Sequence, residues 1–479
     1  MSENGSHHHN SNSNHQNNDI SFKFTPQKLD APQRRESGDN HKMISIVFLS
    51  LLVDLLAFTM ILPLLPSLLD YYAQHDKGGL LPQLQSKIDG FRNLLGIPDT
   101  EKYNSVLFGG VIGSLFSFLQ YIASPVIGAA SDVYGRRPLM LLTMTGIALS
   151  YCVWAVSHNF TLFVIARIIG GISKGNVSLS TTIVTDVSTA TTRGKGMALI
   201  GIAFSIGFIM GPMIGAYFAM SSGGKGEALY FKPALFAITL AVADIIFIFF
   251  FFKETLPRHR RALSFGSSFK DAQDLINPIS LFLFSAVKNI KPSDQRMLRL
   301  LGVCYFFYLF LFSGLEFTLT FLVHRRFQYT SMQQGKMFVF IGAIMALVQG
   351  GYLRRIRPGK EKRVALMGMV VLIPSFLIIG YATSVVPFYT GLALFSFAAG
   401  TVVSCLTTIV SVYGSADQKG TIMGIFRSLG ALARALGPIF ASMWFWSMGP
   451  AICYLLGGVM LIVPLIGLSI VVPQKVMEP

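Results

Sequence analysis

Long apolar runs separated by short polar stretches dominate the chain from residue 43 onward. A helix of about 20 apolar residues spans a hydrocarbon core about 30 Å thick, and a window of that length finds such a segment repeatedly. The pattern predicts about twelve membrane-spanning helices. They lie near residues 43–69, 104–128, 138–157, 160–183, 196–220, 233–252, 299–322, 335–353, 364–382, 385–413, 420–446 and 451–472. The expected fold class is an all-α integral membrane protein.

The polar stretch at 253–298 is the longest connection between spans, and it divides them into two sets of six. The stretch RGKGMALIGIAFSIGFIMGP at 193–212 returns in the same direction as KGTIMGIFRSLGALARALGP at 419–438. Parallel repeats of this kind occur in transporters whose halves are related by an axis along the membrane normal, with a binding site between them. We therefore expect two six-helix bundles, 43–252 and 299–472, joined by a linker.

Both ends of the chain are polar. Residues 1–42 are rich in Asn, Ser, His and Gln, and they cannot bury enough apolar surface to fold. We expect a disordered tail there and a short second tail at 473–479.

Composition and charge agree with a membrane protein of defined orientation. Hydrophobic residues make up 52% of the chain and charged residues 13%, about half the charged share of a soluble domain. Most of the 39 Lys and Arg residues fall in loops on one side if both termini are cytoplasmic. The net charge of +16 is spread over separate loops, so it indicates topology and argues against nucleic-acid binding. It does not distinguish the plasma membrane from an intracellular membrane.

The loop GAASDVYGRRP at 128–138 carries the first chemical motif. Gly128 would let the helix end pack closely, and Asp132 would accept hydrogen bonds from a helix N-terminus. Arg136 and Arg137 would anchor the cytoplasmic face.

A second motif lies in the predicted span 196–220. Gly207, Gly211 and Gly215 recur every four residues and give one smooth helix face for close packing. Pro212 removes a backbone hydrogen bond and favours a bend.

These stretches resemble the major facilitator superfamily. The residues that match its signature between spans two and three are Gly128, Asp132, Gly135, Arg136 and Arg137. Arg167 resembles its second motif, GFIMGPMIGA at 207–216 its antiporter motif, and VDLLAFTMILPLLP at 53–66 the first-helix motif of drug:proton antiporters. The stretch QYIASPVIGAASDVYGRRP at 120–138 is similar to the tetracycline-resistance branch nearly position for position.

The resemblance implies alternating access, in which two halves rock about a central cavity and the Asp132 cluster latches the cytoplasmic side. It implies gating by the signature residues, by Arg167 and by the Gly-Pro face of span five. The chain departs from the bacterial exporters, which resemble one another in having acids in spans three and nine and a histidine in span eight. Here those spans lack these residues, and Arg355 stands where the second half would align with Asp132. Proton coupling by that route is not expected.

Arg167 and Lys174 lie inside a predicted span, seven residues apart and therefore on one helical face. A charge in hydrocarbon costs about 2.5–3.5 kcal/mol or more, so both should face the bundle interior or a cavity. Arg167 would pair with backbone or an acid. Lys174, near mid-depth, would contact substrate or form a buried pair with an aspartate.

Span eleven repeats this arrangement with Arg427 and Arg434. Arg434 near mid-depth is a candidate substrate contact, and Arg427 a gate or packing residue. Gln120 would hydrogen-bond substrate or join two helices.

Three acids lie in predicted spans. Asp54 is the preferred proton carrier, with a permanent salt bridge to Lys174 or Arg434 as the alternative. Asp244 and Glu316 are weaker candidates for the proton carrier.

The leading hypothesis is a monomeric secondary transporter that exchanges small organic solutes, drugs or amphipathic anions, for protons. The alternatives are a carrier without proton coupling, and a transporter-derived receptor or scaffold that keeps the fold. We find no nucleophile–base pair and no metal-ligand spacing, so no enzymatic activity, cofactor or metal is expected.

Overall fold

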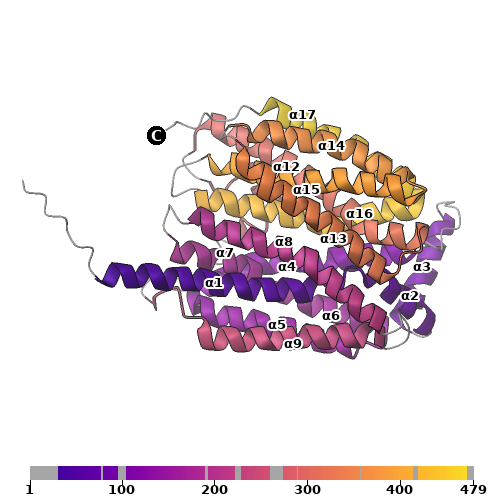
Figure 1. Ribbon diagram of the computed structural model, residues 1–479, viewed down its shortest axis with the longest axis horizontal. Helices are drawn as coiled ribbons and strands as arrows, with labels where there is room; N and C mark the ends of the chain where they lie inside the picture. The colour runs from indigo at the N-terminus through magenta and orange to yellow at the C-terminus, as the bar shows by residue number, and fades with distance from the viewer. Residues whose placement is uncertain are drawn as a thin grey trace, which may run out of the picture.

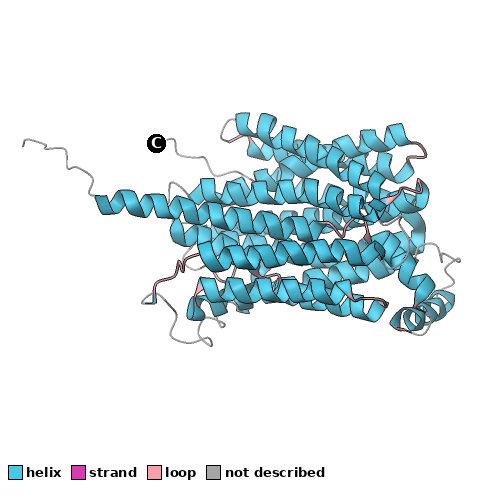
Figure 2. Ribbon diagram, turned by 60° about the horizontal axis from the view of Figure 1, so that its bottom comes forward, coloured by secondary structure: helices cyan, strands magenta, loops and turns pink. Residues whose placement is uncertain are grey.

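Apolar periodicity produces an all-helical molecule over the part of the chain that the structure describes. The computed structural model describes residues 31–76, 79–94, 104–188, 193–221, 228–258, 261, 273–287, 290–356, 359–413 and 419–471. Its helices run roughly parallel to the long axis (Figures 1 and 2). Helix α1 begins and α17 ends at the same end, which we name the terminal face, and the opposite end is the distal face.

The first half contains α1 (Ala31–Thr59), α2 (Leu65–His75), α3 (Leu80–Leu94), α4 (Asn104–Tyr134), α5 (Arg136–Ala155), α6 (Phe160–Ser173), α7 (Asn176–Val187), α8 (Arg193–Ser221) and α9 (Ala228–Phe251). The second half contains α11 (Pro278–Leu283), α12 (Pro292–Arg326), α13 (Ser331–Leu347), the π-helix η3 (Val348–Tyr352), the 3₁₀ turn η4 (Leu353–Arg355), α14 (Glu361–Tyr381), α15 (Val385–Ser411), α16 (Lys419–Met460) and α17 (Ile462–Ile470).

Twelve spans follow from these helices. Eleven helical stretches in the described residues are long and apolar enough to cross a bilayer. The last of them, Thr421–Ile470, has a non-helical bend at Gly449, so it is two spans joined by a tight turn. The φ of Gly449 is 80°, a backbone conformation that glycine adopts without steric cost, and Pro450 follows it. The predicted fold class is therefore confirmed.

Side chains near the helix ends explain several of the boundaries. The Asn159 side chain accepts a hydrogen bond from a first-turn amide of α6, and Asp76 accepts another from the Phe160 amide. Thr330 and Gln333 form a reciprocal capping box at the start of α13. Each contact satisfies backbone donors that a helix start leaves unpaired.

The expected tails and linker differ from the structure where it describes them. Helix α1 begins at Ala31, so residues 31–42 are helical, while residues 1–30 and 472–479 lie outside the described residues. The expected linker ends earlier than predicted, because α12 begins at Pro292. Proline at a first helical position costs no hydrogen bond.

The predicted span 160–183 is interrupted at Lys174 and Gly175, between α6 and α7. Lys174 and Asn176 both donate to the carboxylate of Asp54. Residues two apart in a continuous helix do not face each other, so one carboxylate could not bind both. The break lets both side chains reach the same partner.

Two helix pairs make most of the contact between the halves in the described residues. Helix α4 packs against α16, and α8 packs against α13. Near the distal face Gly110 lies against Ser442, and Gly335 lies against Ala216. The site therefore lies between two bundles that meet along these pairs.

Candidate functional site

The distal face is closed by polar contacts between the halves. Asp70 of α2 accepts from Arg325 Nη2 at 2.6 Å and lies 3.0 Å from His324 Nε2, both on α12. Arg325 also donates to Ser105 of α4 at 2.7 Å. Trp446 of α16 donates to Asn104 of α4 at 2.8 Å and is buried.

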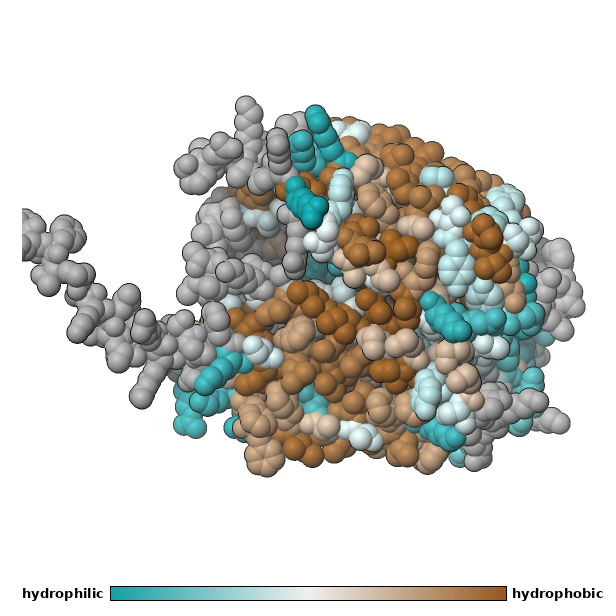
Figure 3. Space-filling view, viewed as in Figure 1, coloured by the Kyte–Doolittle hydropathy of each residue, from teal (hydrophilic) through white to brown (hydrophobic). Residues whose placement is uncertain are grey.

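The terminal side is open. Five glycines near the terminal face have no atom of the described residues within 4 Å of the place a Cβ would take, and they are Gly128, Gly201, Gly350, Gly351 and Gly424. The space-filling view shows a recess between the bundles toward this side (Figure 3). Over the described residues, the two halves are thus apart toward the terminal face. Gly128 was expected to support close packing; here no described residue packs beside it, because the halves are splayed.

Asp54 is the centre of a buried polar cluster in the first half. Both of its oxygens lie 2.7 Å from Lys174 Nζ, and the Asn176 amide donates to Oδ2 at 2.7 Å. The side chains of Asp54 and Lys174 are 0% and 3% exposed. The ammonium also lies 4.7 Å from the centroid of the Phe58 ring. This is the arrangement of a balanced ion pair, and it occupies Lys174 in this conformation.

A second carboxyl lies in the same half without a bonded cation. Asp244 of α9 is buried and accepts a hydrogen bond from Ser50 of α1 at 3.0 Å, while its Oδ1 has no partner among the described residues. The buried Asn176 Oδ1 is unpaired as well. A buried carboxylate with a single hydrogen bond carries a large desolvation cost, which protonation removes.

Arg167 is held by aromatic rings. Its guanidinium carbon lies 4.2 Å from the Phe116 centroid and 5.9 Å from that of Phe58, and the two rings stack at 5.2 Å. The expected acid or backbone partner is absent among the described residues. Arg167 and Lys174 both lie near the Phe58 ring, although the helix between them is interrupted at Lys174.

Arg434 points into the space between the halves. Pro438 and Ser442, one and two turns further along α16, contact Gly110 of α4 at the distal side. Arg434 lies one turn before Pro438 on the same face of α16, nearer the terminal face. It is exposed, and so is Arg427. Neither has a hydrogen bond or ion pair within the described ranges, and the half-buried Glu316 of α12 is within electrostatic range of Arg434.

Gln120 is the matching polar group on α4. Gln120 lies seven residues after Gly113, and Gly113 packs against Phe317 of α12. Gln120 therefore lies on the face of α4 that is turned toward the second half. It is half-buried, and its side chain has no hydrogen-bond partner within the described part of the chain.

Arg136 is a buried hub of polar contacts near the terminal face. Its guanidinium bonds Asp132 at 2.6 Å, Asp186 of α7 at 2.8 Å and Ser131 at 2.5 Å. Both acids and the hydroxyl satisfy its charge in the interior, and its role as an anchor of the cytoplasmic face stays a prediction. Arg137 does lie near the surface, where it donates to the Phe249 carbonyl.

Glu254, which follows α9, caps the N-terminus of α5. Its carboxylate accepts from the backbone amides of Arg136 at 2.9 Å and Arg137 at 3.3 Å. That role was expected of Asp132, which instead belongs to the end of α4 and binds the Arg136 side chain. Gly135 has a φ of 104°, so the turn between the helices requires glycine.

The glycine face of α8 packs against the first helix. A Cβ atom at Gly207 would lie 2.7 Å from Leu55, and Cβ atoms at Gly211 and Gly215 would overlap Thr59 and Met60. Thr59 donates to the Gly207 carbonyl at 2.8 Å. The predicted close packing is confirmed, with α1 as the partner.

Several site residues were not found from the sequence. Asn176, Ser50, Asp186 and Glu254 are common residue types, and their partners lie far away in the chain. Asp186 and Glu254 do stand near the ends of long apolar runs, which is the signal that could have found them.

The twelve spans, the two halves and the polar cavity face define a membrane carrier. Residues 47–438 match the profile of the Major Facilitator Superfamily, and the chain belongs to this family. It is therefore a multi-pass membrane transporter of small solutes and not an enzyme.

Its relatives agree with this assignment. The chain is 50% identical over 437 residues to mouse (Mus musculus) major facilitator superfamily domain-containing protein 10, across 90% of this chain and 93% of the relative. It is 26% identical over 444 residues to the class D tetracycline resistance protein of Salmonella ordonez, across 88% and 97%. The crystal structure of the human organic anion transporter MFSD10 (TETRAN) matches with a TM-score of 0.75 and 48% identity, across 90% of this chain and 99% of that chain. The predicted resemblance is confirmed.

The distal closure gives a first prediction. Asp70→Asn should weaken it, because the amide loses the charge that holds Arg325 and His324. The reporter is a cysteine at the buried Ser442 in a Cys152→Ser background. In the Asp70→Asn variant this cysteine should react with an impermeant thiol reagent about two- to fivefold faster than in the protein that keeps Asp70, the range expected for loss of a partly exposed ion pair. Asp70→Glu is the control that keeps the charge. Equal rates for all three proteins would show that the pair does not hold the distal face closed.

Proposed function

We propose that the protein transports amphipathic organic anions by alternating access of its two halves, in exchange for protons. The observation that carries the substrate class is Arg434, an exposed cation without a protein partner in the described residues, on the face of α16 turned toward the opposite half. A cation presented in an open recess recognises an anionic group by charge-assisted hydrogen bonds. The human relative of known structure, named an organic anion transporter, supports the same class.

The access mechanism rests on the asymmetry of the two faces. Contacts such as Asp70–Arg325 close the distal side, while the glycines near the terminal face have open space beside them. Closing that space requires the halves to rock about the α4–α16 and α8–α13 pairs. Asp132 and the Arg136 hub lie at the moving edge, which fits the proposed latch. A receptor or scaffold would not need such a one-sided opening.

Proton exchange is proposed to use Asp54 together with Asp244. Asp54 is neutralised by Lys174, while Asp244 has Ser50 as its one hydrogen-bond donor in the described residues. If Lys174 moved away from Asp54, Asp54 would join Asp244 as a buried carboxyl without a bonded cation. Asp54 would then need a proton. The pair therefore links the protonation state of the first half to the position of a buried lysine.

Purified protein in liposomes tests both parts of the proposal. We expect uptake of a fluorescent organic anion but not of its neutral analogue, and a faster rate with an imposed pH gradient. Asp244→Asn should remove the response to the gradient and keep exchange at equal pH, because an amide cannot bind a proton near neutral pH. Asp274→Asn, which changes an exposed acid outside the spans, is the matched control. Uptake unaffected by any gradient would support the uncoupled carrier, and absence of uptake would support the receptor.

We further propose that the terminal face is cytoplasmic and that the protein acts as a monomer. The positive loops support the orientation. In the Cys152→Ser background, a cysteine at Gln83 of α3 should react with impermeant reagents from outside intact cells, and one at Arg296 of α12 should react after permeabilisation, if the plasma membrane hosts the protein. The opposite pattern would invert the orientation.

A further inference from the structure

A basic pocket lies on the terminal face, outside the transport site. It is an open pocket of about 560 Å³ between the start of α5 and the segment that follows α9. Its lining residues are Arg137, Pro138, Glu254, Leu256, Pro257, Arg258 and Arg261. Three arginines and one glutamate make the lining net positive.

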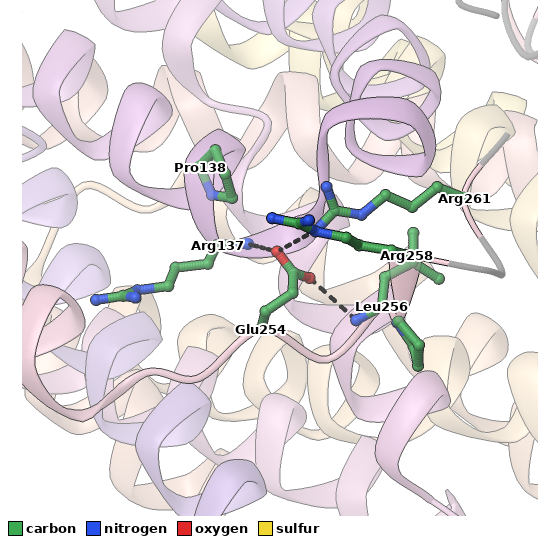
Figure 4. Close-up of a pocket in the computed structure, with 7 residues that line it drawn as sticks. Arg137, Pro138, Glu254, Leu256, Arg258 and Arg261 are labelled. Carbon is green, nitrogen blue, oxygen red and sulfur yellow. Dashed lines mark hydrogen bonds and ion pairs between the residues drawn. The ribbon is translucent and has the colours of Figure 1, made fainter. Parts of the chain in front are cut away.

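Glu254, the one acid among the described residues of the lining, is already engaged. Glu254 accepts from the amides of Arg136, Arg137 and Leu256, and it lies 3.4 Å from Arg261 Nη2 (Figure 4). One carboxylate therefore serves a helix N-terminus, a loop amide and one arginine. It does not neutralise the other two guanidinium groups.

Several donors of the lining have no acceptor. Arg258 is exposed and makes no side-chain hydrogen bond or ion pair within the described residues, and the buried Nε atoms of Arg137 and Arg261 have no partner there. Figure 4 shows the side chains of Arg258 and Arg261 extended in the same direction, with both guanidinium groups beside Glu254. Two like charges that converge on one carboxylate leave donors for a second anion.

The pocket lies at the boundary of the apolar surface. Phe249, Phe250 and Phe251 at the end of α9 are all exposed, which places their rings on the lipid-facing surface of the helix. Arg137 donates to the Phe249 carbonyl and lies 5.6 Å from its ring centroid. Its charged end is thus at the depth where phospholipid phosphates lie.

We propose that this pocket binds the phosphate group of an anionic phospholipid in the leaflet at the terminal face. Arg258 and Arg261 would donate to the phosphate oxygens, and the exposed rings of α9 would lie along the acyl chains. The bound phosphate would sit beside the Glu254 cap of α5, so it would stabilise the turn at Gly135 that carries the Arg136 hub. This inference stands independently of the proposed substrate and of proton coupling.

Binding is tested with the purified full chain in phosphatidylcholine nanodiscs, with and without a minor fraction of phosphatidic acid. We expect phosphatidic acid to raise the thermal unfolding temperature and to remain bound in native mass spectrometry. Arg258→Gln should weaken binding about tenfold, the loss expected for charge-assisted hydrogen bonds, and Arg258→Gln with Arg261→Gln should abolish the shift. Because Arg258 has no bonded partner in the described structure, the single variant should fold as the wild type does.

Controls separate the possible sources of phosphate. The matched variant Arg296→Gln with Arg355→Gln removes two exposed cations of the same face outside the pocket and should keep the shift. Inorganic phosphate and glycerol phosphate, added to phosphatidylcholine nanodiscs, test for a free anion. A shift with these anions as large as with the lipid would replace the lipid by a soluble phosphate. Equal loss in both double variants, or unchanged lipid binding in Arg258→Gln, would overturn the proposal.

Discussion

Replacing Lys174 with glutamine is expected to lower the free energy of unfolding by about 3–5 kcal/mol and to abolish transport. The reason is that Asp54 is completely buried and would lose its cation, keeping the Asn176 amide as its remaining donor in the described structure. Thermal unfolding in detergent and uptake in liposomes measure the two effects. Lys232→Gln, which changes an exposed lysine of the same half, is the control for loss of a positive charge.

The double variant Lys174→Gln with Asp54→Asn distinguishes the two roles of the lysine. If Lys174 balances Asp54, the double variant should recover most of the stability that each single change loses, because no buried charge is left unpaired. Organic-anion affinity should then also survive. If stability returns while affinity for the anion alone is lost, Lys174 contacts substrate after the pair has opened.

Replacing Arg434 with glutamine is expected to raise the anion concentration for half-maximal transport about 10- to 100-fold. The loss corresponds to the hydrogen bonds between the guanidinium and the anionic group of the substrate. No protein acceptor in the described residues competes for the guanidinium. Arg434→Lys should keep part of the affinity through its charge and lose any two-pronged geometry. Binding of an organic anion and of a matched neutral analogue measures the change.

Arg427→Gln is the internal comparison for this prediction. It removes a second exposed arginine of α16, two helical turns closer to the terminal face, and should change affinity less if Arg434 is the anchor. Equal weakening for the anion and the neutral analogue would mean that Arg434 supports the fold or the gate and does not recognise charge. Unchanged affinity would move the anion site elsewhere in the recess.

One sequence expectation failed for a physical reason. Asp132 was assigned to a helix N-terminus from its place in a short loop, and the acidic partners of Arg136 were not predicted. In the structure Glu254, more than a hundred residues further along the chain, caps that helix, and Asp186 supplies a second acid to Arg136. A loop motif shows which charges are present, but their partners depend on which helices pack beside the loop.

The sequence by itself determined the spans, the division into halves and the family. Each rests on local information: an apolar run long enough to cross a bilayer must form a helix to satisfy its backbone, and a repeat or loop signature is readable in one stretch. The tertiary structure alone decided the break at Lys174, the capture of that lysine by Asp54, and the distal contact of Asp70 with Arg325. These pairs are 120 and 255 residues apart in the chain. The packing of the helices brings them together, and burial then makes each charge require its partner.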